Sequence, residues 1–162
     1  MMANDIQFSI VGIDGLLSKL ATVNDEVKRK TGRTALRRAA EMVAKNFKEG
    51  ARRWDDPGTG RSIADNIVLR WNGRLFRRTG DLGFRVGVLH GAVLIKNGST
   101  EKSAPTPHWR LLEFGTEHIA ADPVARPALE DHIAEVTNEF ASQFEKGLDR
   151  AIRREAKSRS GS

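Results

Sequence analysis

The sequence predicts an α+β fold, in which an antiparallel sheet is packed on one face by two long helices and a short N-terminal helix is added. Turn signals between short alternating segments indicate antiparallel strands, and two long segments each carry one apolar stripe with helical spacing. The chain has 162 residues and no cysteine, and a chain of this length buries enough surface to fold without disulfides. We expect a single domain over residues 1–156 and a disordered tail over residues 157–162.

The first predicted elements are a strand, a short helix and a long helix. The strand is Ile6–Val11, whose apolar residues alternate before Gly12. Asp14 is placed to cap a short helix, and the long helix runs from Asp25 to Trp54. Apolar residues mark one face of each helix: Leu16, Leu17 and Leu20 on the short one, and Ala35, Ala39, Val43, Phe47 and Ala51 on the long one.

The middle of the chain predicts the sheet. Asn66–Trp71 is the first of its strands, and Asn72-Gly73 is a strong hairpin signal that would return the chain along Arg74–Arg77. Phe84–Val88 alternates and predicts a further strand, paired with Ala92–Ile95. A polar loop is expected over residues 97–107.

The last third predicts a second long helix. Trp109–Phe114 is short enough to be either a strand or one helical turn. Pro127 suits the first position of a helix, and Arg126, which precedes a proline, is expected to be extended. A continuous apolar stripe then leads along this helix: Leu129, Ile133, Val136, Phe140, Phe144, Leu148 and Ile152.

The net charge is +6, and all of the excess lies in the first half of the chain. Residues 1–81 hold 16 Lys/Arg and 10 Asp/Glu, whereas residues 82–162 hold 11 of each. Six cations of the first long helix can neutralise phosphates without reading bases, or meet an acidic protein surface, or simply form a solvated face. They are Lys28, Arg29, Lys30, Arg33, Arg37 and Arg38.

Catalytic chemistry finds little support in the sequence. The four histidines lack metal-ligand spacing, and Asp55-Asp56 stands before Pro57-Gly58, where a helix stop is the simpler interpretation. Gly58–Arg61 follows a helix and lacks the ending of a phosphate loop. We therefore predict a non-enzymatic protein with no catalytic residue, no cofactor and no metal. No apolar run reaches the length of a membrane span.

One run carries a resemblance to a known family. Glu113-Phe114-Gly115-Thr116, followed by Arg126-Pro127-Ala128 and a helix, is similar to the closing pattern of bacteriophage neck proteins. These are the tail-completion, head–tail joining or minor tail proteins of long-tailed phages. Gly12–Leu20 and the alanine-rich, basic helix over residues 33–53 resemble earlier parts of the same pattern, while Val124 and Ala125 stand where the family carries bulkier apolar residues.

The resemblance implies a structural virion protein of the neck, made in the host cytoplasm during assembly. It implies a homo-oligomeric ring, a hexamer matching the tail tube, that joins the tail to the DNA-filled head. Neighbouring head-connector or stopper proteins, tail-terminator or tail-tube proteins and DNA in the channel would be its partners, with no membrane contact. We expect subunit contacts at six residues: Glu113, Phe114, Gly115, Thr116, Arg126 and Pro127.

Two further expectations accompany this assignment. Glu113 is expected to shape the chain by pairing with an arginine, and the six cations of the first long helix are expected to face DNA or an acidic neighbouring ring. The alternative function is a free nucleic-acid-binding protein without sequence specificity, because the chain has basic clusters but no known base-reading motif.

Overall fold

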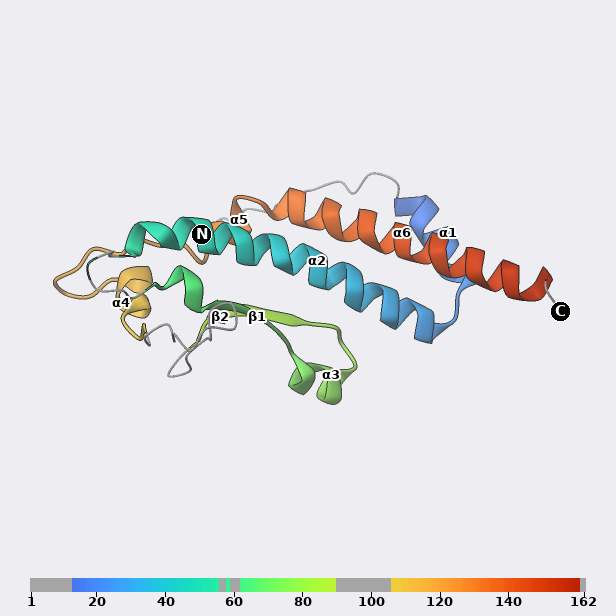
Figure 1. The fold of residues 1–162 in the computed structure, drawn as a ribbon, viewed down its shortest axis with the longest axis horizontal. Coiled ribbons are helices and arrows are strands. Elements are labelled where there is room, and N and C mark those ends of the chain that lie inside the picture. Colours follow the sequence, from blue (N-terminus) through green and yellow to red (C-terminus); the bar gives the residue numbers. More distant parts are fainter. Residues whose placement is uncertain (1–12, 56–57, 59–61, 90–105, 161–162) are drawn as a thin grey trace, which may run out of the picture. The chain divides into compact units, whose positions relative to one another are not determined.

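The computed structural model describes residues 13–55, 58, 62–89 and 106–160 (Figure 1). It confirms the α+β class, with two long helices, an antiparallel sheet and a short N-terminal helix. The predicted strand Ile6–Val11 lies outside the described residues, as do Ala92–Ile95 and most of the loop over residues 97–107. The elements are α1 Ile13–Thr22, α2 Asp25–Ala51, the 3-10 turns Arg52–Trp54 and Ala64–Asn66, β1 Ile67–Trp71, α3 Gly73–Thr79, β2 Phe84–Val88, α4 Trp109–Phe114, α5 Pro127–Glu130 and α6 Ile133–Ser160.

The chain divides into two compact units. A helical unit consists of residues 1–39 and 134–162, and a sheet unit consists of residues 40–133. The helical unit holds α1, the first half of α2 and nearly all of α6, whereas the sheet unit holds both strands and the shorter helices. Each unit is described below by itself.

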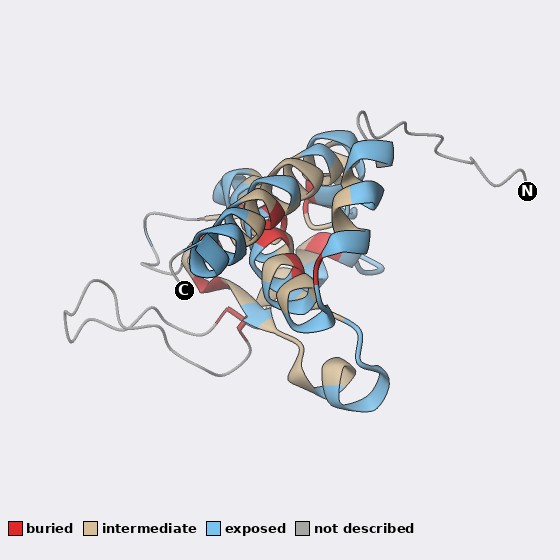
Figure 2. Cartoon of the chain, turned by 90° about the vertical axis from the view of Figure 1, so that its right-hand side faces the viewer, coloured by how far each residue is buried: buried red, intermediate tan, exposed pale blue. Residues whose placement is uncertain are grey.

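Close contact between α2 and α6 defines the helical unit. An added Cβ at Gly147 of α6 would lie only 2.3 Å from Cγ2 of Thr31 on α2, so the absence of a side chain allows the two helices to approach there. Ala35 and Leu148 are almost or fully buried. Figure 2 colours the chain by burial and shows that much of the outward-facing surface of the helices is exposed. The apolar face predicted for the first long helix is therefore buried at Ala35, and α2 runs unbroken from Asp25 to Ala51.

Lys19 joins α1 to α6 within the same unit. Its Nζ lies 2.7 Å from Oε1 of Glu145 and 2.9 Å from Oδ1 of Asp149. The hydrogen bond to Glu145, and then that to Asp149, raises the pKa of Lys19 above its ordinary value.

Asn24 caps the start of α2, because its side-chain oxygen accepts a hydrogen bond from the Val27 amide.

The core of the sheet unit gathers the end of α2, the entry to β1 and the start of α5. Trp54 packs edge-on against Phe47, with ring centroids 6.5 Å apart. The partly buried Val86 and Val88 of β2 and Leu112 of α4 pack around this core. Its buried members are Phe47, Ala51, Ile63, Ala64, Ile67, Val124 and Ala128.

The prediction of a hairpin at Asn72-Gly73 is wrong, because α3 occupies Gly73–Thr79. The Asn72 side chain accepts a hydrogen bond from the Leu75 amide at 3.2 Å and so caps a helix. Gly80 ends that helix in the left-handed region at φ 80°. The strand that returns beside β1 is β2, with Ile67 opposite Val88 and Trp71 opposite Phe84.

Trp109–Phe114, for which a strand and a helical turn were both open, is helical. Arg126 was expected to be extended, but its φ of −68° and ψ of −52° are helical. The carbonyl of Arg126 accepts from the amides of Leu129 and Glu130, so it already belongs to the turn. The second long helix is interrupted at residues 131–132, and α6 continues to Ser160, through four residues that we had assigned to the tail.

Replacing Gly147 tests the close approach of α2 and α6. Gly147→Ala should lower the free energy of unfolding by about 1–3 kcal/mol because its methyl group meets Thr31. Thr31→Ala in the same chain should recover most of the loss. Urea denaturation measures both. A stabilising Gly147→Ala, as helix propensity alone predicts, would contradict the contact.

Candidate functional site

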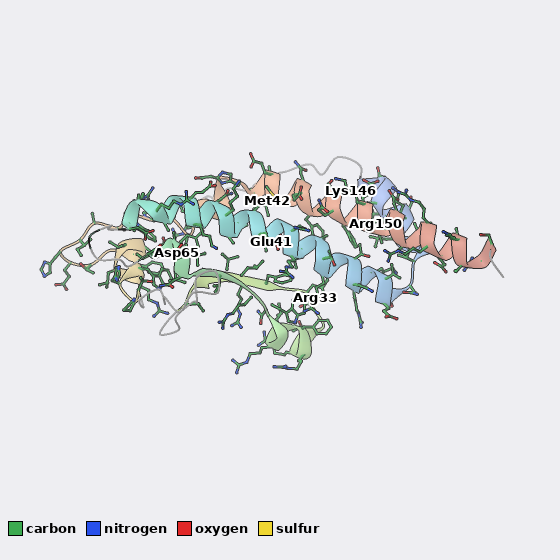
Figure 3. All side chains as sticks on the ribbon, in the orientation of Figure 1. Arg33, Glu41, Met42, Asp65, Lys146 and Arg150 are labelled. Atoms are coloured by element: carbon green, nitrogen blue, oxygen red, sulfur yellow. The ribbon has the colours of Figure 1, made fainter. Side chains whose placement is uncertain are left out.

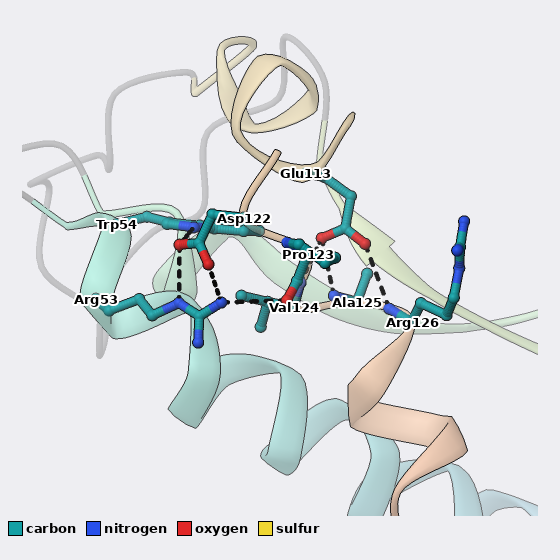
Figure 4. Close-up of polar contacts among 8 residues, drawn as sticks. All are labelled: Arg53, Trp54, Glu113, Asp122, Pro123, Val124, Ala125 and Arg126. Carbon is teal, nitrogen blue, oxygen red and sulfur yellow. Dashed lines mark hydrogen bonds and ion pairs between the residues drawn. The ribbon is translucent and has the colours of Figure 1, made fainter. Parts of the chain in front are cut away.

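The carboxylate of Glu113 binds the backbone that leads into α5. Its Oε2 accepts from the amides of Val124 at 2.7 Å and Ala125 at 2.9 Å, and its Oε1 accepts from the amide of Arg126 at 3.3 Å (Figure 4). Glu113 is only 5% exposed. A buried carboxylate needs such donors, and three consecutive amides supply them. Glu113 thus fixes the chain just before Pro127.

Gly115 allows the chain to turn back immediately after α4. Its φ of 72° lies in the left-handed region, and an added Cβ would lie 2.8 Å from the Ala121 nitrogen and 2.9 Å from the Ile119 oxygen. Both atoms are backbone and have little freedom to move. The Asp122 amide then donates to the Leu112 carbonyl at 2.8 Å, which closes the loop against α4.

The other end of this loop is tied to the end of α2. The Asp122 carboxylate accepts from Nε1 of Trp54 at 2.8 Å and Nε of Arg53 at 2.9 Å, and it also pairs with Nη2 of Arg53 (Figure 4). Hydrogen bonds from Arg53 and then Trp54 lower the pKa of Asp122. Val124 is buried against Gly50, where an added Cβ would lie 2.4 Å from Cγ1 of Val124.

We name residues 111–127 the strapped segment, since internal hydrogen bonds hold it along its length. Three large apolar side chains on it remain exposed: Leu111 is 48%, Phe114 65% and Ile119 45% accessible. Several exposed large apolar side chains on one ordered segment are a feature of protein contact surfaces. This geometry can bind another protein surface.

The predicted site residues have different positions in this segment. Phe114 is exposed, whereas Glu113 is buried and Gly115 acts through its backbone. Thr116 uses its hydroxyl oxygen to accept from the amides of His118 and Ile119. Arg126 is the N-cap of α5 and Pro127 lies in its first turn. We expected Glu113 to pair with an arginine side chain, but its carboxylate accepts hydrogen bonds from backbone amides, including that of Arg126.

Sequence reasoning missed Leu111, Ile119 and the Asp122 cluster. Leu111-Leu112 gave no decisive signal, because two neighbouring leucines on a helix can either share one broad apolar face or point to different sides. Asp122 carried no local signal, since its partners Arg53 and Trp54 lie almost 70 residues earlier.

The family model described as "Bacteriophage HK97-gp10, putative tail-component" matches residues 14–115. The chain belongs to this family. The resemblance to phage tail proteins is thereby confirmed, and the chain is a structural tail component of the virion from a family that is not an enzyme family. Comparisons with curated proteins and with solved structures gave no match.

The six predicted cations of this tail component all lie on α2, within the helical unit. Lys28 pairs with Asp25 at 3.1 Å, while Arg29 and Lys30 are exposed. Arg33, Arg37 and Arg38 are also exposed and have interactions within the chain. Figure 3 shows Arg33 on α2 and Arg150, a cation that we had not selected, on α6.

The carboxylate of Asp55 has a structural role at the end of α2. It accepts from the Ser62 hydroxyl at 2.9 Å and from the Ile63 amide at 2.6 Å, joining the helix end to the entry of β1. Among the residues that the structure describes, no cluster of histidine and carboxylate groups could hold a metal ion. Within the same residues, none of the helices combines the length and apolar character of a membrane span.

Glu113→Gln should lower the free energy of unfolding by about 1–3 kcal/mol, because the amide replaces a charged acceptor of three backbone donors. Glu117→Gln is the matched control, since Glu117 is exposed on the same segment, and should change stability by less than about 0.5 kcal/mol. Urea denaturation measures both. Equal effects would show that the Glu113 bonds contribute nothing specific.

Asp122 should make stability depend on pH in the acid range. Its pKa is lowered below 3.8 in the folded chain, so its stabilisation is complete well above pH 3.8 and is lost as the pH falls through the folded-state pKa. Asp122→Asn should therefore lower Tm at neutral pH and have a much smaller effect in strong acid. Thermal unfolding across this range measures the difference, and a pH-independent difference would exclude the charged interaction.

Proposed function

We propose that this tail component completes the end of the phage tail and joins it to the DNA-filled head as a closed ring. The observation that carries the proposal is the exposed apolar trio of Leu111, Phe114 and Ile119 on the strapped segment. Exposed side chains of this kind favour a permanent protein partner, because their burial removes apolar surface from water. The Glu113 bonds hold the segment ordered before any partner arrives.

A ring requires one patch of each copy to meet a different patch of the next copy. We assign the strapped segment to one side of that contact, with Phe114 as its central anchor and Glu113, Gly115, Thr116, Arg126 and Pro127 as the residues that shape or border it. Aromatic side chains often dominate binding energy at such contacts. A hexamer follows if the ring shares the symmetry of the tail tube.

The proposed neighbours are a head-connector or stopper protein above the ring and a tail-terminator or tail-tube protein below it. The basic cluster on α2 would then face either DNA in the channel or an acidic surface of a neighbouring ring. Both roles use charge without base-specific contacts, which agrees with exposed Arg29, Lys30 and Arg33 on one helix.

Replacing Phe114 tests the proposal. Phe114→Ser should leave the monomer folded, since the side chain is 65% exposed, but should reduce phage titre at least about tenfold in a complementation assay, because a central interface aromatic contributes about 2 kcal/mol or more. Electron microscopy of the lysate should show separate heads and tails.

Leu17→Ser is the matched control, because Leu17 is 57% exposed on α1 in the helical unit. It should support normal titre. Full titre with Phe114→Ser would reject the interface assignment, and virions whose neck lacks the protein by immunolabelling would reject the neck position itself.

A further inference from the structure

We infer that a groove between α2 and α6 binds the phosphate backbone of a nucleic acid. The groove lies entirely within the helical unit and has a volume of about 640 Å³. It shares no residue with the strapped segment and does not depend on the proposed ring. Its lining comes from the first half of α2 with the residue before it, and from residues 143–158 of α6.

Three cations line this groove from both helices. Lys30 comes from α2, and Arg150 and Arg154 come from α6. Within the described part of the chain, none of the three forms a salt bridge with a carboxylate. The one acidic residue of the lining, Glu155, already pairs with Arg159 at 3.0 Å. The groove therefore presents uncompensated positive charge to an anion.

The arrangement of the two arginines suits phosphates. Arg150 and Arg154 are four residues apart, so they lie on one face of α6 about 6 Å apart along its axis. The Nε of Arg150 donates to the Lys146 carbonyl at 3.2 Å, which orients the guanidinium on its own helix. Guanidinium groups bind phosphate oxygens through two parallel hydrogen bonds, and Lys30 adds a charge from the other helix.

The rest of the lining favours a nucleic acid over an acidic protein segment. Protein contacts depend on large apolar or aromatic anchors, whereas the apolar lining here consists of Val27, Gly147 and Ala151. The hydroxyls of Thr34 and Ser158 donate to carbonyls of their own helices, so the cations supply the main donors. Such a surface recognises backbone charge and not base sequence.

Charge across the whole helical unit supports the same ligand. Its residues 1–39 and 134–162 hold 13 Lys/Arg and 9 Asp/Glu, which is +4 of the total of +6. A net positive unit attracts a polyanion over a longer range than the groove itself. The α6 arginines extend the phosphate contacts beyond the basic cluster of α2, with which the groove shares only Lys30.

A paired substitution tests the groove. Arg150→Gln with Arg154→Gln should weaken binding of the full chain to a short fluorescent duplex about tenfold, because two charge-assisted contacts are lost. The slope of log K against log salt should fall by about 2. Fluorescence anisotropy at several salt concentrations measures both quantities, and circular dichroism checks that the helices remain.

Arg153→Gln with Lys157→Gln is the matched control, because it removes the same charge from α6 outside the groove lining. It should change affinity less than threefold, about 0.6 kcal/mol, and the slope by less than 1. Equal losses in both variants would overturn the site in favour of diffuse attraction, as would unchanged binding by the groove variant. Stronger competition by a polyglutamate peptide than by unlabelled duplex would assign the groove to an acidic protein partner. Loss of ring formation with normal duplex binding would instead affect only the proposed function.

Discussion

The buried carboxylate of Glu113 is the interaction on which the sheet unit depends. Burying a charge is unfavourable unless strong donors replace the lost water, and here three successive amides of residues 124–126 replace it. The same bonds set the direction in which the chain enters α5. Val124 and Ala128 consequently reach the core, where they meet Phe47 and Ala51 of α2.

This internal fastening separates the shaping of the strapped segment from the contacts that it can make. The Glu113 side chain is buried and its carboxylate is bound by backbone amides, while the adjacent Phe114 is 65% exposed. A segment already held by Gly115, Asp122 and Glu113 loses little conformational freedom when its outer side chains are covered. Binding energy from Phe114 can therefore stabilise a complex without first ordering the chain, and the proposed ring would gain this at each contact between copies.

The parts of the fold that could be predicted are those with a long local pattern. The α2 stripe and the alternation in Phe84–Val88 both identify their elements correctly. The hairpin prediction at Asn72-Gly73 was wrong because the same dipeptide suits both a hairpin turn and the start of a helix. Here the Leu75 amide bonds to the Asn72 side chain and β1 pairs with β2, and both contacts favour the helix start. The prediction of an extended Arg126 was wrong because Glu113, which binds its backbone amide, lies 13 residues away in the sequence. The groove forms between residues of α2 and α6 that are more than 100 residues apart in the sequence, so no local sequence pattern predicts it.

The exposed apolar side chains of the strapped segment and the cationic groove would bind through different interactions, so they suit different partners. The proposed contacts through Leu111, Phe114 and Ile119 would rest on apolar burial, which salt weakens little and often strengthens. The proposed contacts through Lys30, Arg150 and Arg154 would rest on charge, which salt screens and for which counterions compete. In the proposed neck position, the ring would need a permanent association with its neighbours and only a transient one with DNA passing through its channel. Apolar side chains on an ordered segment would meet the first need. A cationic groove without apolar anchors would meet the second, because it would bind phosphates without recognising a particular base sequence.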